Sequence, residues 1–307
     1  MTDPESRNKT LALTRRRLIL SLAGSFGLGG ILTAAGLRAL DRFGSPFTPF
    51  WATLDQVVPE AGVNTAVSFG ESLQRLIAAG ALDPVKLGTY YMTNRGLPDW
   101  VKHLFAAPST APIVLSFETA PFLLNLLWPL GLATKTKFNV SNPINGPTLG
   151  SFASTGGWQF AKNGDGSAYF NRVAAIQLTD DQDRRVFELA GKIFRPCCDN
   201  STYFQDCNHG SALLGLLELA TAQDATVEEL YRIALAANSY WFPDQYAKTA
   251  FYFTLFEGRP WNDVPAELIL GPQFSSQSGW QNNVNERIRL ASFMSRTGKM
   301  EQGACAI

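Results

Sequence analysis

The second half of the chain most constrains its fold, because helix start signals and helix-period apolar residues recur there. Thr179 and Thr226 each begin a capping box, in which a Thr and a Gln or Glu three residues later satisfy each other's backbone donors. Further helices are expected over 207–219, 244–256 and 281–294, where apolar residues follow the helical period. The sequence therefore predicts a mainly α, multi-helix globular domain.

The first half of the chain predicts shorter helices. Apolar residues over 67–77 recur near helical spacing, and proline-containing start signals at 83–84 and 98–99 each begin a short helix. The apolar run 113–132 contains a glutamate, an asparagine and two prolines. We expect a buried core helix here and not a membrane span.

A small β-hairpin is predicted near 157–170. Aromatic residues flank a segment that contains Asn163-Gly164 and Asp165-Gly166. Both dipeptides favour the tight turns that join antiparallel strands. This hairpin is the main sheet that we expect in the protein.

Composition limits the class of function. Of 307 residues, 46% are hydrophobic, which is typical of a globular chain. The 26 basic and 26 acidic residues balance, and no basic run lies outside the N-terminus, so we expect no nucleic-acid binding. Four cysteines are too few for a disulfide-dense scaffold.

Three arginines at 15–17 precede an apolar run over 18–37. This arrangement resembles a twin-arginine (Tat) export signal. The run is about long enough to span a bilayer, and the arginines would keep its start cytoplasmic. We therefore predict a signal or membrane anchor over 1–42 and an exported helical domain over 43–307, in the periplasm or on the outer face of the cytoplasmic membrane. The alternative is a buried N-terminal helix.

The segment 195–210 contains three of the four cysteines and one of the two histidines. Cys197 and Cys198 follow an expected helix that ends at Pro196, and Cys207 stands at the start of the next helix. A thiolate at a helix N-terminus is stabilised by unpaired backbone N–H groups, so Cys207 is the best candidate for a reactive or metal-bound thiolate.

The leading interpretation is a metal site formed by Cys197, Cys198, Cys207 and His209, with Asp206 orienting the imidazole. Thiolates and imidazole suit copper or zinc. The spacing matches no standard zinc motif, and it lacks the patterns of c-type haem and iron–sulfur clusters. The likeness to a Tat signal favours the same interpretation, because that export route suits chains that acquire a cofactor before export.

Two alternatives stay open. In a thiol–disulfide oxidoreductase, Cys207 would attack and Cys197 or Cys198 would resolve. In a non-enzymatic helical partner-binding protein, a disulfide from Cys207 to either neighbour would only brace the fold. The expected partners are a redox or metal-donor protein, and the membrane through the N-terminal segment. His103 is expected on a helix surface, and Cys305 in the C-terminal tail.

Overall fold

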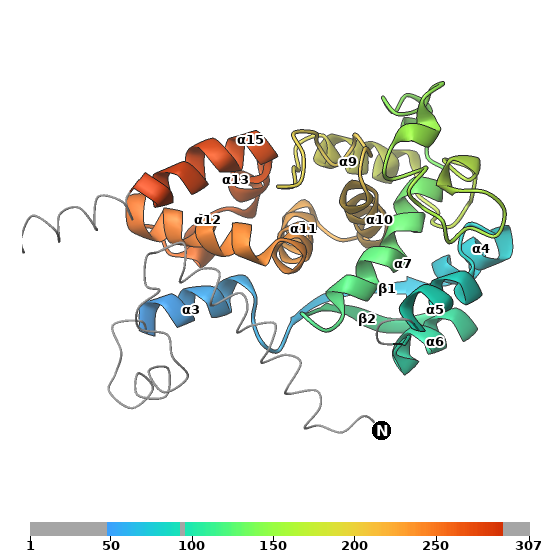
Figure 1. The fold of residues 1–307 in the computed structure, drawn as a ribbon, viewed down its shortest axis with the longest axis horizontal. Helices are drawn as coiled ribbons and strands as arrows, with labels where there is room; N and C mark the ends of the chain where they lie inside the picture. Colours follow the sequence, from blue (N-terminus) through green and yellow to red (C-terminus); the bar gives the residue numbers. More distant parts are fainter. Residues whose placement is uncertain (1–47, 93–95, 291–307) are drawn as a thin grey trace, which may run out of the picture.

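The computed structural model describes residues 48–92 and 96–290 as a mainly helical fold with one small sheet, which confirms the predicted fold class (Figure 1). The helices before residue 150 are α3 (Thr48–Val57), α4 (Ser72–Ala79), α5 (Pro84–Met92), α6 (Asp99–Ala106), α7 (Ala120–Ala133) and α8 (Lys137–Val140). The later α-helices are α9 (Asp180–Ala190), α10 (Asn208–Ala222), α11 (Val227–Trp241), α12 (Pro243–Phe256), α13 (Ala266–Leu270), α14 (Pro272–Ser275) and α15 (Gln277–Trp280). Short 3-10 turns lie at Leu149–Ser151, Gly166–Ala168 and Trp261–Asp263, and a π turn lies at Gln281–Asn285.

Helices α7 and α10 form the centre of the core. All residues of α10 from Gly210 to Thr221 are buried, as are most residues of α7. The two helices meet at their backbones, because a Cβ on Gly215 would lie 2.7 Å from Leu127 O and 2.7 Å from Gly131 N. The expectation of a buried core helix within 113–132 is confirmed for α7.

The sheet lies elsewhere than predicted. Strands β1 (Val63–Gly70) and β2 (Ser109–Leu115) pair antiparallel, with Val63 opposite Leu115. The prediction of helix over 67–70 is therefore wrong. Thr65, Val67 and Phe69 are buried at every second position along β1, which is the period of a strand. In the sequence this period runs directly into the apolar residues of helix α4, so the two elements read as one helix.

The predicted hairpin near 157–170 is absent, and that segment contains turns and a 3-10 helix. Its backbone bonds elsewhere, since Asp83 N donates to Phe160 O and Lys162 N donates to Gly80 O. Trp158 is fully buried, and its Nε1–H donates to Ala81 O at 2.8 Å. Core packing of this indole therefore decided the path of the segment, and the turn residues serve the 3-10 helix.

Both predicted capping boxes are present, at Thr179 and Thr226. Helix α9 ends at Ala190 and not at Pro196, because a turn over 191–192 leads into an antiparallel bridge between Phe194 and Ser201. Phe194 N donates to Leu270 O, and Thr202 N donates to Ile193 O. This extended stretch carries Arg195 inward between α9 and the C-terminal helices.

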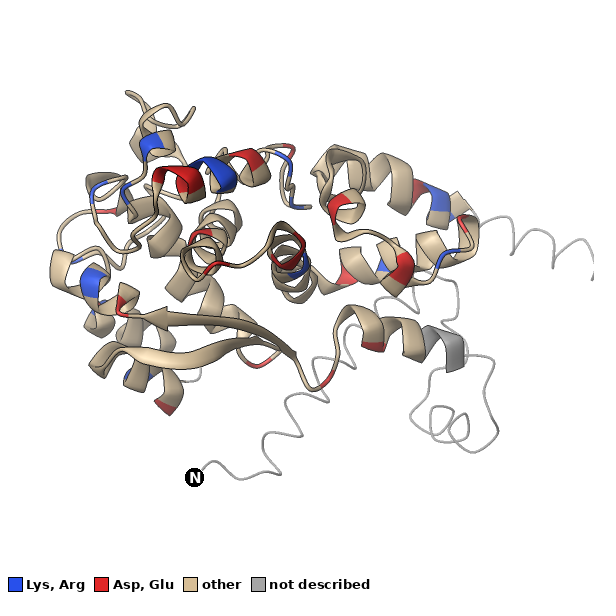
Figure 2. Ribbon diagram, turned by 180° about the vertical axis from the view of Figure 1, so that it is seen from behind, with Lys and Arg blue, Asp and Glu red and all other residues tan. Residues whose placement is uncertain are grey.

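The C-terminal helices form one side of the molecule, where α3 lies beside α12 (Figure 1). Acidic and basic residues are mixed along the ribbon (Figure 2). Among the described residues, no helix combines the length and the apolar character that a membrane crossing needs. The predicted signal or anchor over 1–42 and Cys305 lie outside the described residues.

Candidate metal centre

The cysteine-bearing loop folds around the guanidinium of Arg195, which is fully buried. An arginine has five N–H donors in a planar fork, and here all five have an acceptor. Nε donates to Cys207 Sγ at 3.1 Å. The other four donate to Asn200 O, Ser201 O, Phe204 O and Asp206 Oδ1. One side chain therefore determines the course of the chain from residue 195 to 207.

Gly210 lets helix α10 begin directly against this guanidinium. A Cβ at Gly210 would lie 2.6 Å from Nη2 and 2.7 Å from Cζ of Arg195. Cys207 is the N-cap of α10, and its sulfur accepts from Gly210 N at 3.4 Å. The predicted place of Cys207 at a helix N-terminus is confirmed. The thiol itself is the cap, in a position where Ser, Thr, Asp or Asn is usual.

Three sulfurs converge above this helix end. The sulfur of Cys197 lies 3.8 Å from that of Cys198 and 3.6 Å from that of Cys207. The expected proximity of Cys207 to the cysteine pair is confirmed. All three are free thiols, since a disulfide needs about 2.05 Å between sulfurs.

His209 and Asp206 extend the cluster to two sets of donors. The donor atoms of Cys197, Cys207 and His209 lie within 4.8 Å of one another, as do those of Cys198, Asp206 and Cys207. Cys207 belongs to both sets. The described residues thus contain a Cys/His/Asp cluster whose spacing can hold a metal ion.

The three cysteine thiols differ in acidity. Hydrogen bonds from Cys197 and Cys198 lower the pKa of Cys207, with further help from His209 and the charge of Arg195. The bonds that Cys197 makes to its two neighbours raise its pKa, as does burial. For Cys198, the hydrogen bond with Cys197 lowers the pKa. The hydrogen bond with Cys207 and burial outweigh this effect and raise the pKa to about 11. Cys207 is therefore the most acidic thiol of the cluster.

The prediction that Asp206 orients the imidazole is wrong. Its carboxylate accepts from Arg195, from Asn200 Nδ2 at 2.8 Å and from the Cys198 thiol at 3.7 Å. His209 instead packs against aromatic rings, 4.6 Å from Phe242 and 5.9 Å from Trp241 between centroids. The imidazole is therefore positioned by these rings and by its contact with Cys207, and the carboxylate by the guanidinium.

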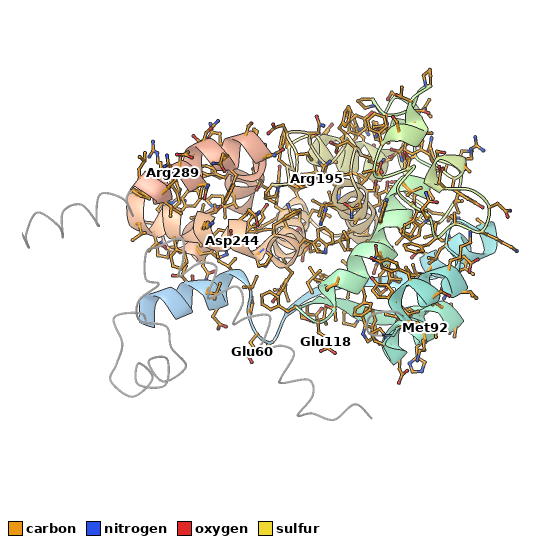
Figure 3. All side chains as sticks on the ribbon, viewed as in Figure 1. Glu60, Met92, Glu118, Arg195, Asp244 and Arg289 are labelled. Carbon is orange, nitrogen blue, oxygen red and sulfur yellow. The ribbon has the colours of Figure 1, made fainter. Side chains whose placement is uncertain are left out.

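The C-terminal helices hold the loop from its other side. Gln277 N donates to Cys198 O at 3.0 Å, and Ser278 N donates to Asp199 Oδ1 at 2.7 Å. Asn238 Nδ2 donates to Phe194 O just before the loop. Figure 3 shows Arg195 between these helices and α9. Segments far apart in the sequence thus fix the cysteine cluster.

No role for Arg195 or Gly210 was predicted from the sequence. An arginine directly before Pro-Cys-Cys and a glycine in the first turn of an apolar helix were the available signals. Both have their effect only in the tertiary structure, where the glycine makes room for the guanidinium. His103 is exposed on α6, as expected, and is not one of the clustered donors.

Comparison with known proteins finds no counterpart. No family model, no curated protein and no solved structure matches this chain. The geometry and chemistry of the cluster are therefore the basis for inferring a function.

Proposed function

We propose that this protein binds one copper or zinc ion through Cys197, Cys198, Cys207 and His209. The observation that carries the proposal is the spacing of the sulfurs. A tetrahedral zinc with bonds of about 2.3 Å to sulfur separates its thiolates by about 3.8 Å. The separations of 3.8 Å and 3.6 Å at Cys197 match that edge.

The chemistry of the donors supports the same ions. Thiolates and imidazole are ligands that zinc and copper favour over harder ions. A complex of three thiolates with either ion carries net negative charge, and the buried Arg195 guanidinium beside Cys207 offsets part of it. Asp206 restrains that guanidinium and is also within reach of Cys198.

The proposal is tested by metal content. We expect about one zinc or copper ion per purified wild-type chain. For Cys207→Ser, the metal content should fall below a tenth of the wild-type value. For His209→Ala, the affinity for the metal should drop at least about tenfold. Circular dichroism checks that each variant is folded. Wild type without stoichiometric metal contradicts the proposal.

Export is part of the proposed function and rests on the resemblance of the N-terminal segment to a Tat signal. An exported site would receive its ion from a metal-donor protein or in the cytoplasm before export. A reporter fused after Phe43 should appear outside the cytoplasmic membrane. Replacing Arg15 and Arg16 by lysine should block this, and an unchanged cytoplasmic product would show that the segment is no signal.

A thiol–disulfide oxidoreductase is the second candidate. The observation that favours it is the sulfur of Cys207, the most acidic thiol of the cluster, lying 3.6 Å from the Cys197 sulfur. Thiol counts under oxidising and reducing conditions separate the two functions. A metal-free wild type whose Cys197–Cys207 bond is reduced by mild thiols supports the oxidoreductase. A bond that resists them supports the braced partner-binding protein.

A further inference from the structure

We infer that the bound ion enters and leaves at Cys197, by exchange of that thiolate for one from an external thiol, while Cys207 keeps hold of the ion. This inference rests on the proposed metal site. It follows from how unequally the three cysteines are held.

Cys207 is the fixed ligand. Its sulfur accepts from Arg195 Nε and from Gly210 N, two donors that belong to a buried side chain and to a helix end. Both donors favour the thiolate, and both would remain in place with a metal on the sulfur. Displacing Cys207 would leave the buried guanidinium without one of its five acceptors, which is costly.

Cys198 is restrained through its backbone. Its carbonyl accepts from Gln277 N at 3.0 Å, so its backbone is tied to helix α15. The hydrogen bond from its thiol to Asp206 would be given up when the ion binds, but the backbone bond would remain. Movement of Cys198 away from an ion would therefore strain the chain where it is bonded to α15.

Cys197 has neither restraint. It is exposed, whereas Cys198 and Cys207 are half-buried. The hydrogen bonds of its sulfur are those with the other two sulfurs, which metal binding replaces by bonds to the ion. An incoming thiol can therefore approach the ion at this side, and Cys197 can turn toward solvent without breaking any of the hydrogen bonds that hold Cys198 and Cys207 to the fold.

The exchange step balances without an oxidant. The sulfur of the external thiol forms a bond to the ion, and the bond from the ion to Cys197 breaks. The proton that the external thiol loses is taken up by the Cys197 thiolate. The ion keeps its oxidation state, so the partner chemistry required is only a thiol.

The experiment follows zinc release from the full chain to the chromophoric chelator 4-(2-pyridylazo)resorcinol, with glutathione as the external thiol. For wild type we expect the release rate to rise in proportion to glutathione. Cys197→Ser should still bind zinc but release it at least about tenfold faster, with little dependence on glutathione. Cys198→Ser, the matched control, should retain the glutathione dependence.

A second measurement tests the inference on the wild type alone, in case a variant folds poorly. The zinc-loaded wild type is treated briefly with iodoacetamide, and its peptides are mapped by mass spectrometry. Among the three cluster thiols, Cys197 should be alkylated first. Alkylation of Cys198 or Cys207 first, or a release rate unaffected by glutathione, overturns the inference. A wild type that holds no zinc or copper instead overturns the proposed function itself.

Discussion

Two buried ionisable groups lie at helix α10, and their polar atoms are satisfied to very different degrees. At its first turn lies Arg195, fully buried, with an acceptor for each of its five N–H groups. In its second half lies Glu218, only 1% exposed, whose Oε2 has no partner among the described residues. One group is surrounded by polar atoms, and the other by the apolar core.

The difference shows when a buried charge persists. Burial raises the pKa of Glu218 well above its ordinary value, and the negative charge of Asp183 acts in the same direction. The raised pKa favours the protonated form of Glu218, which lowers the cost of its burial. Arg195 stays charged because carbonyls, a carboxylate and a thiolate replace its water, which makes it the organiser of the loop.

The largest effect on the free energy of unfolding is expected from replacing Arg195, the buried charge whose donors all have acceptors. Arg195→Met should lower the free energy of unfolding by about 3–5 kcal/mol, because the loop acceptors and Asp206 lose their common donor. Metal uptake should fall with it. Arg184→Met is the matched control, since Arg184 is exposed and pairs only with Asp181 on the same helix. Its change should be about 0.5 kcal/mol or less by urea denaturation. Equal effects would show that Arg195 does not organise the loop.

A smaller effect is expected from crowding the guanidinium. Gly210→Ala places a methyl against Arg195 and should cost about 1–3 kcal/mol in the free energy of unfolding. It should also weaken zinc or copper binding, because Cys207 shares that helix end. Gly146→Ala is the control, since nothing lies within 4 Å of a Cβ there. An unchanged metal affinity for Gly210→Ala would show that the packing at the start of α10 does not affect metal binding at Cys207.

Of the three substitutions, Glu218→Met is expected to change the free energy of unfolding least at low pH. Because folding raises its pKa, the contribution of Glu218 to stability is fully present below the unfolded pKa, near pH 4, and is lost as the pH rises through the folded pKa. Glu218→Met should remove this dependence. It should gain about 1 kcal/mol at pH 4, where it removes an unpartnered buried oxygen. Its gain should be larger at pH 8. Urea denaturation across that range measures both, and parallel pH profiles would show that Glu218 is not the titrating group.

Local signals predicted the long helices α9, α10, α11 and α12, but not the C-terminal end of α9 or the short helices over 266–280. The capping boxes at Thr179 and Thr226 act within one turn, so their geometry follows from neighbouring residues alone. The buried character of α7 and α10 likewise follows from apolar runs long enough to have no polar face. For these elements, the sequence and the tertiary structure agree because the same residues specify both.

The sheet and the segment 157–170 could not be predicted in this way. Strand β1 pairs with β2 across three intervening helices, a contact that no local pattern encodes. Trp158 enters the core between distant segments, and that burial overrides the turn preference of its neighbours. Burial of one large side chain can outweigh the tenths of a kcal/mol by which local propensities differ.

The sequence by itself determined the members of the cluster and the helix end at Cys207, because the cysteines and His209 are close in the chain. Only the tertiary structure decided how they are held. Arg195 is directed inward by an extended stretch bonded to Leu270, and Gly210 leaves room for it. A buried guanidinium is stable only where acceptors converge on it in three dimensions, and that convergence depends on the packing of distant helices.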